Sequence, residues 1–102
     1  MIHVLATIQL KPGQRAAFLQ EFHQVMPKVH QEQGCIEYGP TVDAASDIGV
    51  QTRVGDDTVV IIEKWESLAA LEAHLTAPHM LEYRQKVKDF VNGSTIHILQ
   101  PA

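Results

Sequence analysis

The first third of the chain carries two different patterns of apolar positions. From Ile2 to Leu10 apolar residues occupy every second position, which predicts a strand with one apolar face. From Gln14 they recur at helical spacing as far as Gly34, a residue type that commonly ends helices. Pro27 lies inside this second pattern and lacks the N–H that a helix needs, so a kink or a break is expected there.

Extended patterns dominate the middle of the chain. Residues 35–42 and 48–54 are predicted to be extended, and the Gly-Asp-Asp sequence at 55–57 favours a hairpin turn. Residues 58–65 form the clearest strand, because aliphatic and β-branched residues fill most of it.

A second helical region follows. Ser67 is suited to cap its first helix, whose predicted inner stripe consists of Leu68, Leu71 and Leu75. Pro78 interrupts this helix, and helical spacing resumes at Met80 and continues almost to the Asn-Gly-Ser sequence at 92–94. Residues 95–99 are predicted to be a short final strand.

The predicted order is strand, helix, strand, strand, helix, strand. This order is typical of a ferredoxin-like, split βαβ α+β domain, with an antiparallel sheet and both helices on one face, here spanning residues 1–102 as one domain. Residues 59–62 are apolar in both phases, and Leu5 and Leu99 also lie in the phase that helices would not cover. Because no element is left to cover that face, we expect a second copy to pack there and form a homodimer.

Composition excludes several classes of partner. The formal net charge is −4, and the eight basic residues are dispersed, which argues against nucleic acid as a ligand. The longest purely aliphatic run has four residues, whereas a membrane span needs about 20, and the first residues do not resemble a signal peptide. We therefore expect a cytoplasmic protein without a membrane span.

Six histidines raise the question of a metal site, and their spacing argues against one. Two pairs of histidines lie close in the sequence, His23 with His30 and His74 with His79. Neither pair has the spacing that would let both rings bind one metal ion. His3 and His97 fall on strands that could be neighbours, so that pair stays conceivable. The single cysteine, Cys35, excludes an internal disulfide and is expected to be an ordinary strand residue.

Several side chains near the second helix could carry chemistry. Helical geometry places His74 at the border of the apolar stripe, as either a general base in a cavity or a boundary residue with its tip in water. Trp65 shares one face of its strand with Glu63 and is expected mainly to pack in the core. Glu63 should either pair with Arg84 or Lys86 or expose its carboxylate at a pocket rim.

Three segments resemble a known family. "EQGCIEYGP" at residues 32–40, "IIEKWESLAALEAHLTAPHM" at residues 61–80 and the terminal "ILQPA" are similar to the antibiotic biosynthesis monooxygenase superfamily, and closely to its bacterial quinol monooxygenase branch. The resemblance covers nearly the whole chain. It implies a ferredoxin-like domain that dimerises into an α/β barrel, in agreement with the dimer expected from the pattern.

The resemblance also implies an activity. Members oxidise hydroxylated aromatic molecules such as quinols with O2 and without flavin, haem or metal as cofactor. Carried onto matching positions, Trp65 would form a pocket wall, His74 would be a base or a polar contact to substrate, and His79 would have a less defined role at the substrate. Tyr83 and Arg84 join the candidates from helical phase rather than from the motif, and Glu63 joins them from strand phase.

Other functions of the superfamily are less consistent with this chain. Haem-degrading members use an asparagine, a tryptophan and a haem-ligating histidine where an approximate alignment gives Ala6, His74 and Arg84 here. An isomerase of a phosphorylated metabolite would need cations near the pocket, for which only Arg84 and Lys86 are plausible. A non-enzymatic binder of small aromatic molecules is the third alternative.

Overall fold

The strands form one antiparallel sheet in the order β2-β3-β1-β4. The structure is a computed structural model that describes residues 1–102. Its strands are β1 (Ile2–Leu10), β2 (Cys35–Thr41), β3 (Thr58–Trp65) and β4 (Val91–Leu99). The two central strands, β1 and β3, are therefore separated in sequence by a helix and an edge strand, which is the split βαβ connection.

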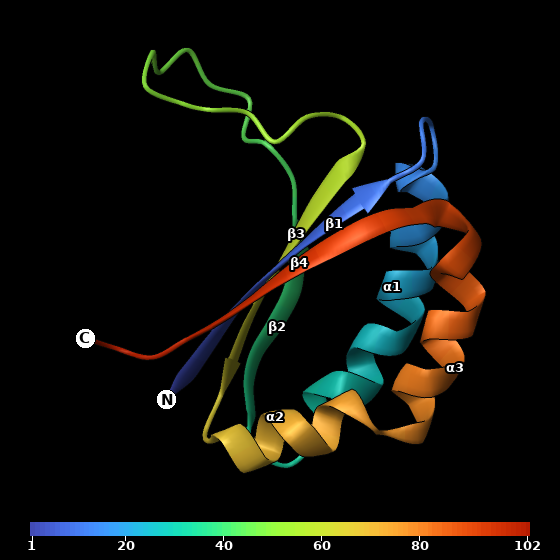
Figure 1. The fold of residues 1–102 in the computed structure, drawn as a ribbon, viewed down its shortest axis with the longest axis vertical. Helices are drawn as coiled ribbons and strands as arrows, with labels where there is room; N and C mark the ends of the chain where they lie inside the picture. The colour runs from blue at the N-terminus through green and yellow to red at the C-terminus, as the bar shows by residue number, and fades with distance from the viewer.

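The helices cover one face of this sheet. They are α1 (Arg15–His30), α2 (Leu68–Leu75) and α3 (Pro78–Val87), followed by one 3₁₀ turn, η1 (Lys88–Phe90). Figure 1 shows α1 and α3 side by side, with α2 at one end of the helical layer. The predicted ferredoxin-like α+β fold is confirmed. No helix in the structure has the length and apolar character needed to span a bilayer.

The core lies between the helices and one phase of the strands. Val59, Ile61 and Trp65 of β3 are buried on this inner face, beside Val4 and Ala6 of β1. The aromatic rings of α1 and α3 pack against them. Each fully buried large apolar side chain contributes about 1.5–3 kcal/mol to folding, so this face holds the two layers together.

The outer face of the sheet carries no helix. Register places Leu5 between His97 and Ile62, and Leu99 beside His3 on the same face. Leu5 and Leu99 are exposed. The pattern therefore predicted correctly which phase of the strands the helices leave uncovered.

Helix α1 is continuous and shorter than predicted. It runs through Pro27 without a break and ends at His30, after which a turn leads to Gly34. Gly34 has a φ of +84°, and a Cβ added there would lie only 2.6 Å from the Cβ of Ala70. A glycine is therefore required for the turn to approach α2, and the backbone N–H of Glu66 donates to the Gly34 carbonyl at 2.9 Å.

Helix α2 confirms its predicted cap but not its predicted stripe. The Ser67 hydroxyl accepts a hydrogen bond from the Ala70 N–H at 3.1 Å. Leu71 is buried, but Leu68 and Leu75 are exposed, and His74 takes the second buried position. This short helix lies across the end of the helical layer, so only a narrow i, i+3 stripe reaches the core.

The connection between β2 and β3 contains neither the strand nor the hairpin predicted for residues 48–57. Side chains hold it together instead. Asp43 accepts hydrogen bonds from the backbone N–H groups of Val54 and Gly55, both at 2.9 Å, and Arg53 donates to the carbonyls of Ala44 and Ser46. Residues 43–46 and 53–55 are thus joined by side-chain hydrogen bonds and not by a backbone ladder. In Figure 1 this connection projects beyond the end of the sheet.

The last strand starts earlier than predicted. Helix α3 ends at Val87, and Val91 pairs with Leu10 of β1 instead of continuing the helix. The backbone N–H of Lys11 donates to the Phe90 carbonyl at 2.8 Å, which fixes this transition. After the 3₁₀ turn η1, pairing with the central strand therefore overrides the helical spacing at Val91.

Candidate active site

A cavity of about 280 Å³ lies between the inner face of the sheet and α3, with one wall from α2. Most of its lining is apolar. The polar or charged side chains that reach it come from several elements and are Tyr38, Glu63, His74, Tyr83, Arg84, Lys88 and Ser94. An apolar cavity with a few convergent polar groups is the usual form of a small-molecule site, and its volume is near the lower end of the common range of roughly 300–1,000 Å³.

His74 is the best-enclosed polar group of this cavity. Its side chain is only 2 % exposed, so it is buried rather than at the boundary where helical phase had placed it. The ring lies between Trp65, with ring centroids 4.6 Å apart, and Tyr38, with centroids 5.3 Å apart in an edge-on arrangement. Two aromatic neighbours and the packing of α2 therefore leave the imidazole little freedom to rotate.

Glu32 binds the inner edge of the His74 ring. Nδ1 of His74 lies 3.1 Å from Oε1 and 2.9 Å from Oε2 of the Glu32 carboxylate. A carboxylate only accepts hydrogen bonds, so Nδ1 must carry the proton. Nε2 forms no hydrogen bond within the chain. Every fully buried side-chain nitrogen or oxygen does form one, so Nε2 cannot be fully buried and reaches open space. The one hollow that His74 lines is the cavity.

Burial and Glu32 act on the pKa of His74 in opposite directions. Burial lowers the pKa because it penalises the charged imidazolium, and this is the larger effect. The hydrogen bond to Glu32 and the charge of that carboxylate raise it, but the net pKa stays below the ordinary value of histidine. At neutral pH the ring is therefore an uncharged acceptor with its free lone pair at Nε2.

Glu63 does not pair with a cation. Its buried carboxylate accepts a hydrogen bond from Nε1 of Trp65 at 2.9 Å, and it forms no ion pair, so the predicted pairing with Arg84 or Lys86 is wrong. Burial raises the pKa of Glu63 to about 7, although the Trp65 hydrogen bond opposes this shift. A substantial fraction of Glu63 is therefore protonated at neutral pH, in contact with the cavity.

Trp65 lies behind the cavity rather than in its wall. Its side chain has no exposed surface, and it contacts His74 on one side while donating to Glu63. Trp65 therefore packs in the core, as expected. It also orients two polar groups of the site, His74 and Glu63.

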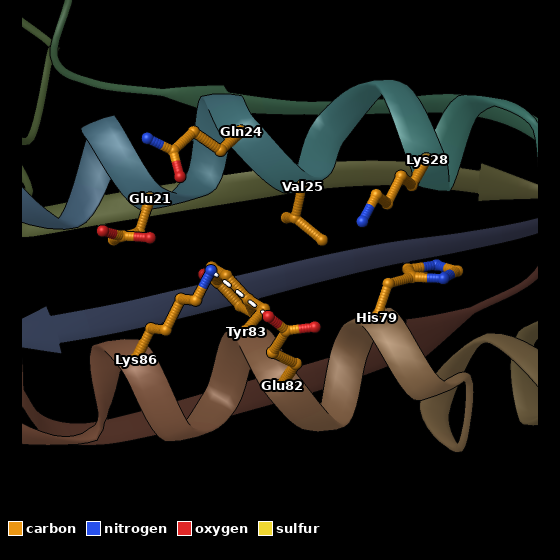
Figure 2. A pocket seen from close by; sticks show the side chains of 8 residues that line it. All are labelled: Glu21, Gln24, Val25, Lys28, His79, Glu82, Tyr83 and Lys86. Atoms are coloured by element: carbon orange, nitrogen blue, oxygen red, sulfur yellow. Dashed lines mark ion pairs between the residues drawn. The ribbon is translucent and has the colours of Figure 1, made fainter.

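His79 faces a second hollow, a polar cleft between α1 and α3. Figure 2 shows His79 of α3 and Lys28 of α1 on facing sides of this cleft, with the ion pair of Lys86 and Glu82 further along α3. Nε2 of His79 lies 2.7 Å from Oε2 of Glu32, so His79 shares one carboxylate oxygen with His74. Spacing along the chain had separated these two histidines, but the turn after α1 brings Glu32 between them.

The remaining candidates divide between the two hollows. Tyr83 is buried and lines both, so its ring separates the cavity from the cleft, and burial raises the pKa of its hydroxyl. Arg84 reaches the cavity from the exposed side of α3, while Lys86 lines the cleft only. Of the candidate residues, the cavity therefore brings together His74, Glu63, Tyr83 and Arg84.

The other histidines have separate surroundings. Nε2 of His30 lies 2.7 Å from the carbonyl oxygen of Tyr38. His3 and His97 lie on the neighbouring strands β1 and β4 but not directly opposite each other, since their partners in the register are Leu99 and Leu5. No group of three or more histidine, cysteine, aspartate or glutamate side chains has a geometry that could hold a metal ion. Cys35 is half-buried in β2, and burial raises the pKa of its thiol.

Comparison with known proteins identifies the family. Residues 1–86 match the family described as antibiotic biosynthesis monooxygenase. The chain belongs to this family. The predicted family membership, and with it the assignment to the monooxygenases, is confirmed.

Relatives and solved structures agree with this assignment. The chain is 46 % identical over 103 aligned positions to the probable quinol monooxygenase YgiN of Escherichia coli, covering 99 % of this chain and 98 % of the relative. It is 28 % identical to the putative monooxygenase YcnE of Bacillus subtilis, covering 91 % and 88 %. A crystal structure of PA3566 from Pseudomonas aeruginosa superimposes with a TM-score of 0.81 at 25 % identity, covering 99 % and 93 %.

Sequence reasoning missed Glu32. It lies in the turn between α1 and β2, whereas the helical pattern predicted a helix as far as Gly34, and its two partners are 42 and 47 positions away. The nearest signal is Gly34, because a glycine two positions on marks a tight turn but does not say what the turn approaches.

Proposed function

We propose that this protein is a monooxygenase that oxidises a small quinol or a related hydroxyaromatic molecule with O2 in the cavity, with His74 as the general base. The observation that carries the proposal is the geometry of His74. Its Nδ1–H is held by Glu32, and its unprotonated Nε2 faces the cavity. The 46 % identity to a probable quinol monooxygenase supports the substrate class.

The cavity suits one small planar substrate. Its apolar lining would bury the aromatic rings, while a hydroxyl group of the substrate could reach His74. Glu63 and Tyr83 supply two further polar contacts, and the raised pKa of each favours the protonated form, which can donate a hydrogen bond to an oxyanion. Arg84 at the edge of the cavity adds a cation. We assign Trp65 to supporting His74 and Glu63.

The chemistry needs only a base and a dry pocket. Nε2 of His74 accepts the proton of a quinol hydroxyl, and the electron-rich anion passes one electron to O2. Recombination of the two radicals forms a C–O bond, and the resulting peroxide takes the proton back from His74. Its O–O bond then breaks as the ring C–H proton is lost and water leaves. Quinol and O2 thus give hydroxyquinone and water, and the quinol supplies all four electrons.

Oxygen uptake tests this function. The purified protein is mixed with a chemically reduced naphthoquinone in the presence of a chelator, without added cofactor, and O2 consumption and the hydroxyquinone product are measured. We expect turnover well above the spontaneous oxidation rate. Uptake no faster than the spontaneous rate would contradict the monooxygenase, and tight quinone binding without turnover would favour the alternative of a non-enzymatic binder.

We also propose that a second copy of the chain covers the outer face of the sheet. The support is the row of apolar and half-buried side chains there, centred on Leu5 and Ile62 of the two central strands. Two sheets that pack face to face remove such a row from water. Light scattering should give twice the mass of 11.4 kDa, and the double variant Leu5→Lys, Ile62→Lys should be a folded monomer. A wild-type monomer at micromolar concentration would contradict the dimer.

A further inference from the structure

We propose that Glu32 is the positioning residue of the site, and that His79 holds its carboxylate in place from the solvent side. Glu32 would fix the tautomer of His74 and would stabilise the imidazolium that forms when His74 accepts a proton. This inference rests on the proposed role of His74 as the base. It adds that Glu32 and His79 enable His74 to act as the base.

The tautomer argument follows from hydrogen-bond chemistry. A free neutral histidine can carry its proton on either ring nitrogen, and only the Nδ1–H form leaves Nε2 free to accept a proton from substrate. The oxygens of a carboxylate only accept hydrogen bonds, so Nδ1 of His74 is the donor to both oxygens of Glu32. The same argument places the proton of His79 on Nε2, since that nitrogen lies 2.7 Å from Oε2.

The charge argument follows from burial. The Glu32 side chain is only 13 % exposed, and no lysine or arginine forms an ion pair with it. Its negative charge is therefore available to His74 at short range with little screening by water. An imidazolium in a mostly apolar cavity is costly, and a carboxylate 2.9 Å away lowers that cost.

The fold holds Glu32 in this position from several directions. The turn is closed by backbone hydrogen bonds from Glu32 to the Val29 carbonyl and from Cys35 to the Glu32 carbonyl, and Gly34 packs directly against α2. His79 donates from the first turn of α3, where Pro78 starts the helix. The carboxylate therefore joins the end of α1 to both α2 and α3, and its two imidazole partners prevent it from turning into the cleft.

Other ionisable groups near His74 have to be separated from Glu32 in any test. They contact the ring or line the same cavity, and they are Tyr38 of β2, Glu63 of β3, His79, Tyr83 and Arg84 of α3, and Lys88 of η1. Glu63 is the main competitor because it titrates near neutrality in the same cavity. A Glu63→Gln background identifies any step in a pH profile that belongs to Glu63 and not to His74.

The first test uses the ligand-free protein. Nitrogen-15 NMR of the histidine rings should show His74 as the Nδ1–H tautomer in the wild type and as a mixture, or as the other tautomer, in Glu32→Gln. The matched control Glu82→Gln removes an exposed carboxylate from α3 and should leave the His74 signals unchanged. A wild-type His74 in the Nε2–H tautomer, or a tautomer that Glu32→Gln does not affect, would overturn the proposal even if the protein has no oxygenase activity.

The second test uses turnover. Glu32→Gln should lower the plateau of kcat/KM by about 10- to 100-fold, which is part of the 10²–10⁴-fold that a positioned base supplies. Because the carboxylate raises the pKa of His74, its loss should also move the acidic limb of the pH profile to lower pH. Glu32→Asp should recover part of the rate, and His79→Ala should cost less than Glu32→Gln.

A purely structural role for Glu32 predicts a different result. It would lower the melting temperature or the folded fraction without moving the acidic limb or the tautomer. Wild-type kcat/KM and an unshifted limb in a folded Glu32→Gln protein would overturn the proposal. An inactive wild type would instead refute the proposed function, and the NMR result would then decide the role of Glu32 by itself.

Discussion

His74 and His79 donate to the same oxygen of Glu32, yet one faces an apolar cavity and the other a polar cleft. His74 is 2 % exposed, and burial lowers its pKa, whereas the side chain of His79 is 21 % exposed and lies opposite Lys28. The residue type and the hydrogen-bond partner are the same. The two rings differ in their exposure to water, because His79 is partly exposed to solvent and His74 is almost completely shielded from it.

This contrast shows why a histidine at helical spacing is not in itself a catalytic residue. The ring in the cleft is partly exposed and is surrounded mainly by polar and charged side chains. A ring in the cavity meets only what enters the cavity, with one nitrogen already committed to a carboxylate. Substitutions in the cavity should therefore have the largest effects, those in the turn between the two hollows smaller effects, and those in the cleft the smallest.

Removal of the buried ring should have the largest effect. His74→Ala is expected to lower kcat/KM for a reduced naphthoquinone by about 100- to 10,000-fold, because a positioned general base contributes that much. The control is His23→Ala, which removes an exposed histidine from α1 and should retain the wild-type rate. A folded, dimeric His74→Ala protein with full activity would show that the cavity does not use this base.

The turn that carries Glu32 should be next in sensitivity. Gly34→Ala introduces both a strained φ and a collision with Ala70, and should lower the free energy of unfolding by about 2–4 kcal/mol. Gly13→Ala is a matched control because its φ is also positive, at +78°, but no atom lies within 4 Å of the added Cβ. Equal losses in denaturant unfolding of the two variants would mean that the close approach to α2 is unimportant.

Glu63 should make stability depend on pH. The pKa of this carboxyl is raised in the folded state to about 7 from 4.5, so its stabilising effect is complete below pH 4.5 and is lost as pH rises through 7. The wild type should lose about 3 kcal/mol relative to Glu63→Gln across this window. Urea unfolding of both proteins between pH 4.5 and 8 measures this difference, and a constant difference would contradict the raised pKa.

Changes in the cleft should have the smallest effects. Lys86 and Glu82 form an ion pair at 3.4 Å with both side chains about half or more exposed. Lys86→Ala should change the free energy of unfolding by no more than about 0.5 kcal/mol, because water screens exposed pairs. Thermal unfolding and kcat/KM near the wild-type values would agree with this. A large loss of activity would instead give the cleft a part in the reaction.

The candidate site was only partly predictable. Periodicity placed His74 beside the apolar stripe, and the resemblance raised it to the leading candidate, but the stripe itself was wrong, since Leu68 and Leu75 are exposed. Of the two alternatives predicted for Glu63, the ion pair with Arg84 or Lys86 is wrong, and the carboxylate instead accepts a hydrogen bond from the indole of Trp65 on the same strand face. Side-chain partners on one face depend on rotamers and packing, which spacing does not specify.

The order of strands and helices, the apolar face that the helices cover and the phase they leave open follow from the sequence alone, because alternation and helical spacing act locally. Three segments of the sequence also carry the family resemblance. Only the tertiary structure decided that Glu32, 42 residues before His74, binds that ring and leaves its free nitrogen facing the cavity. The physical reason is that a hydrogen bond between distant residues forms only when two elements are positioned relative to each other to within a few tenths of an ångström. Here Gly34 permits the close approach of the turn to α2.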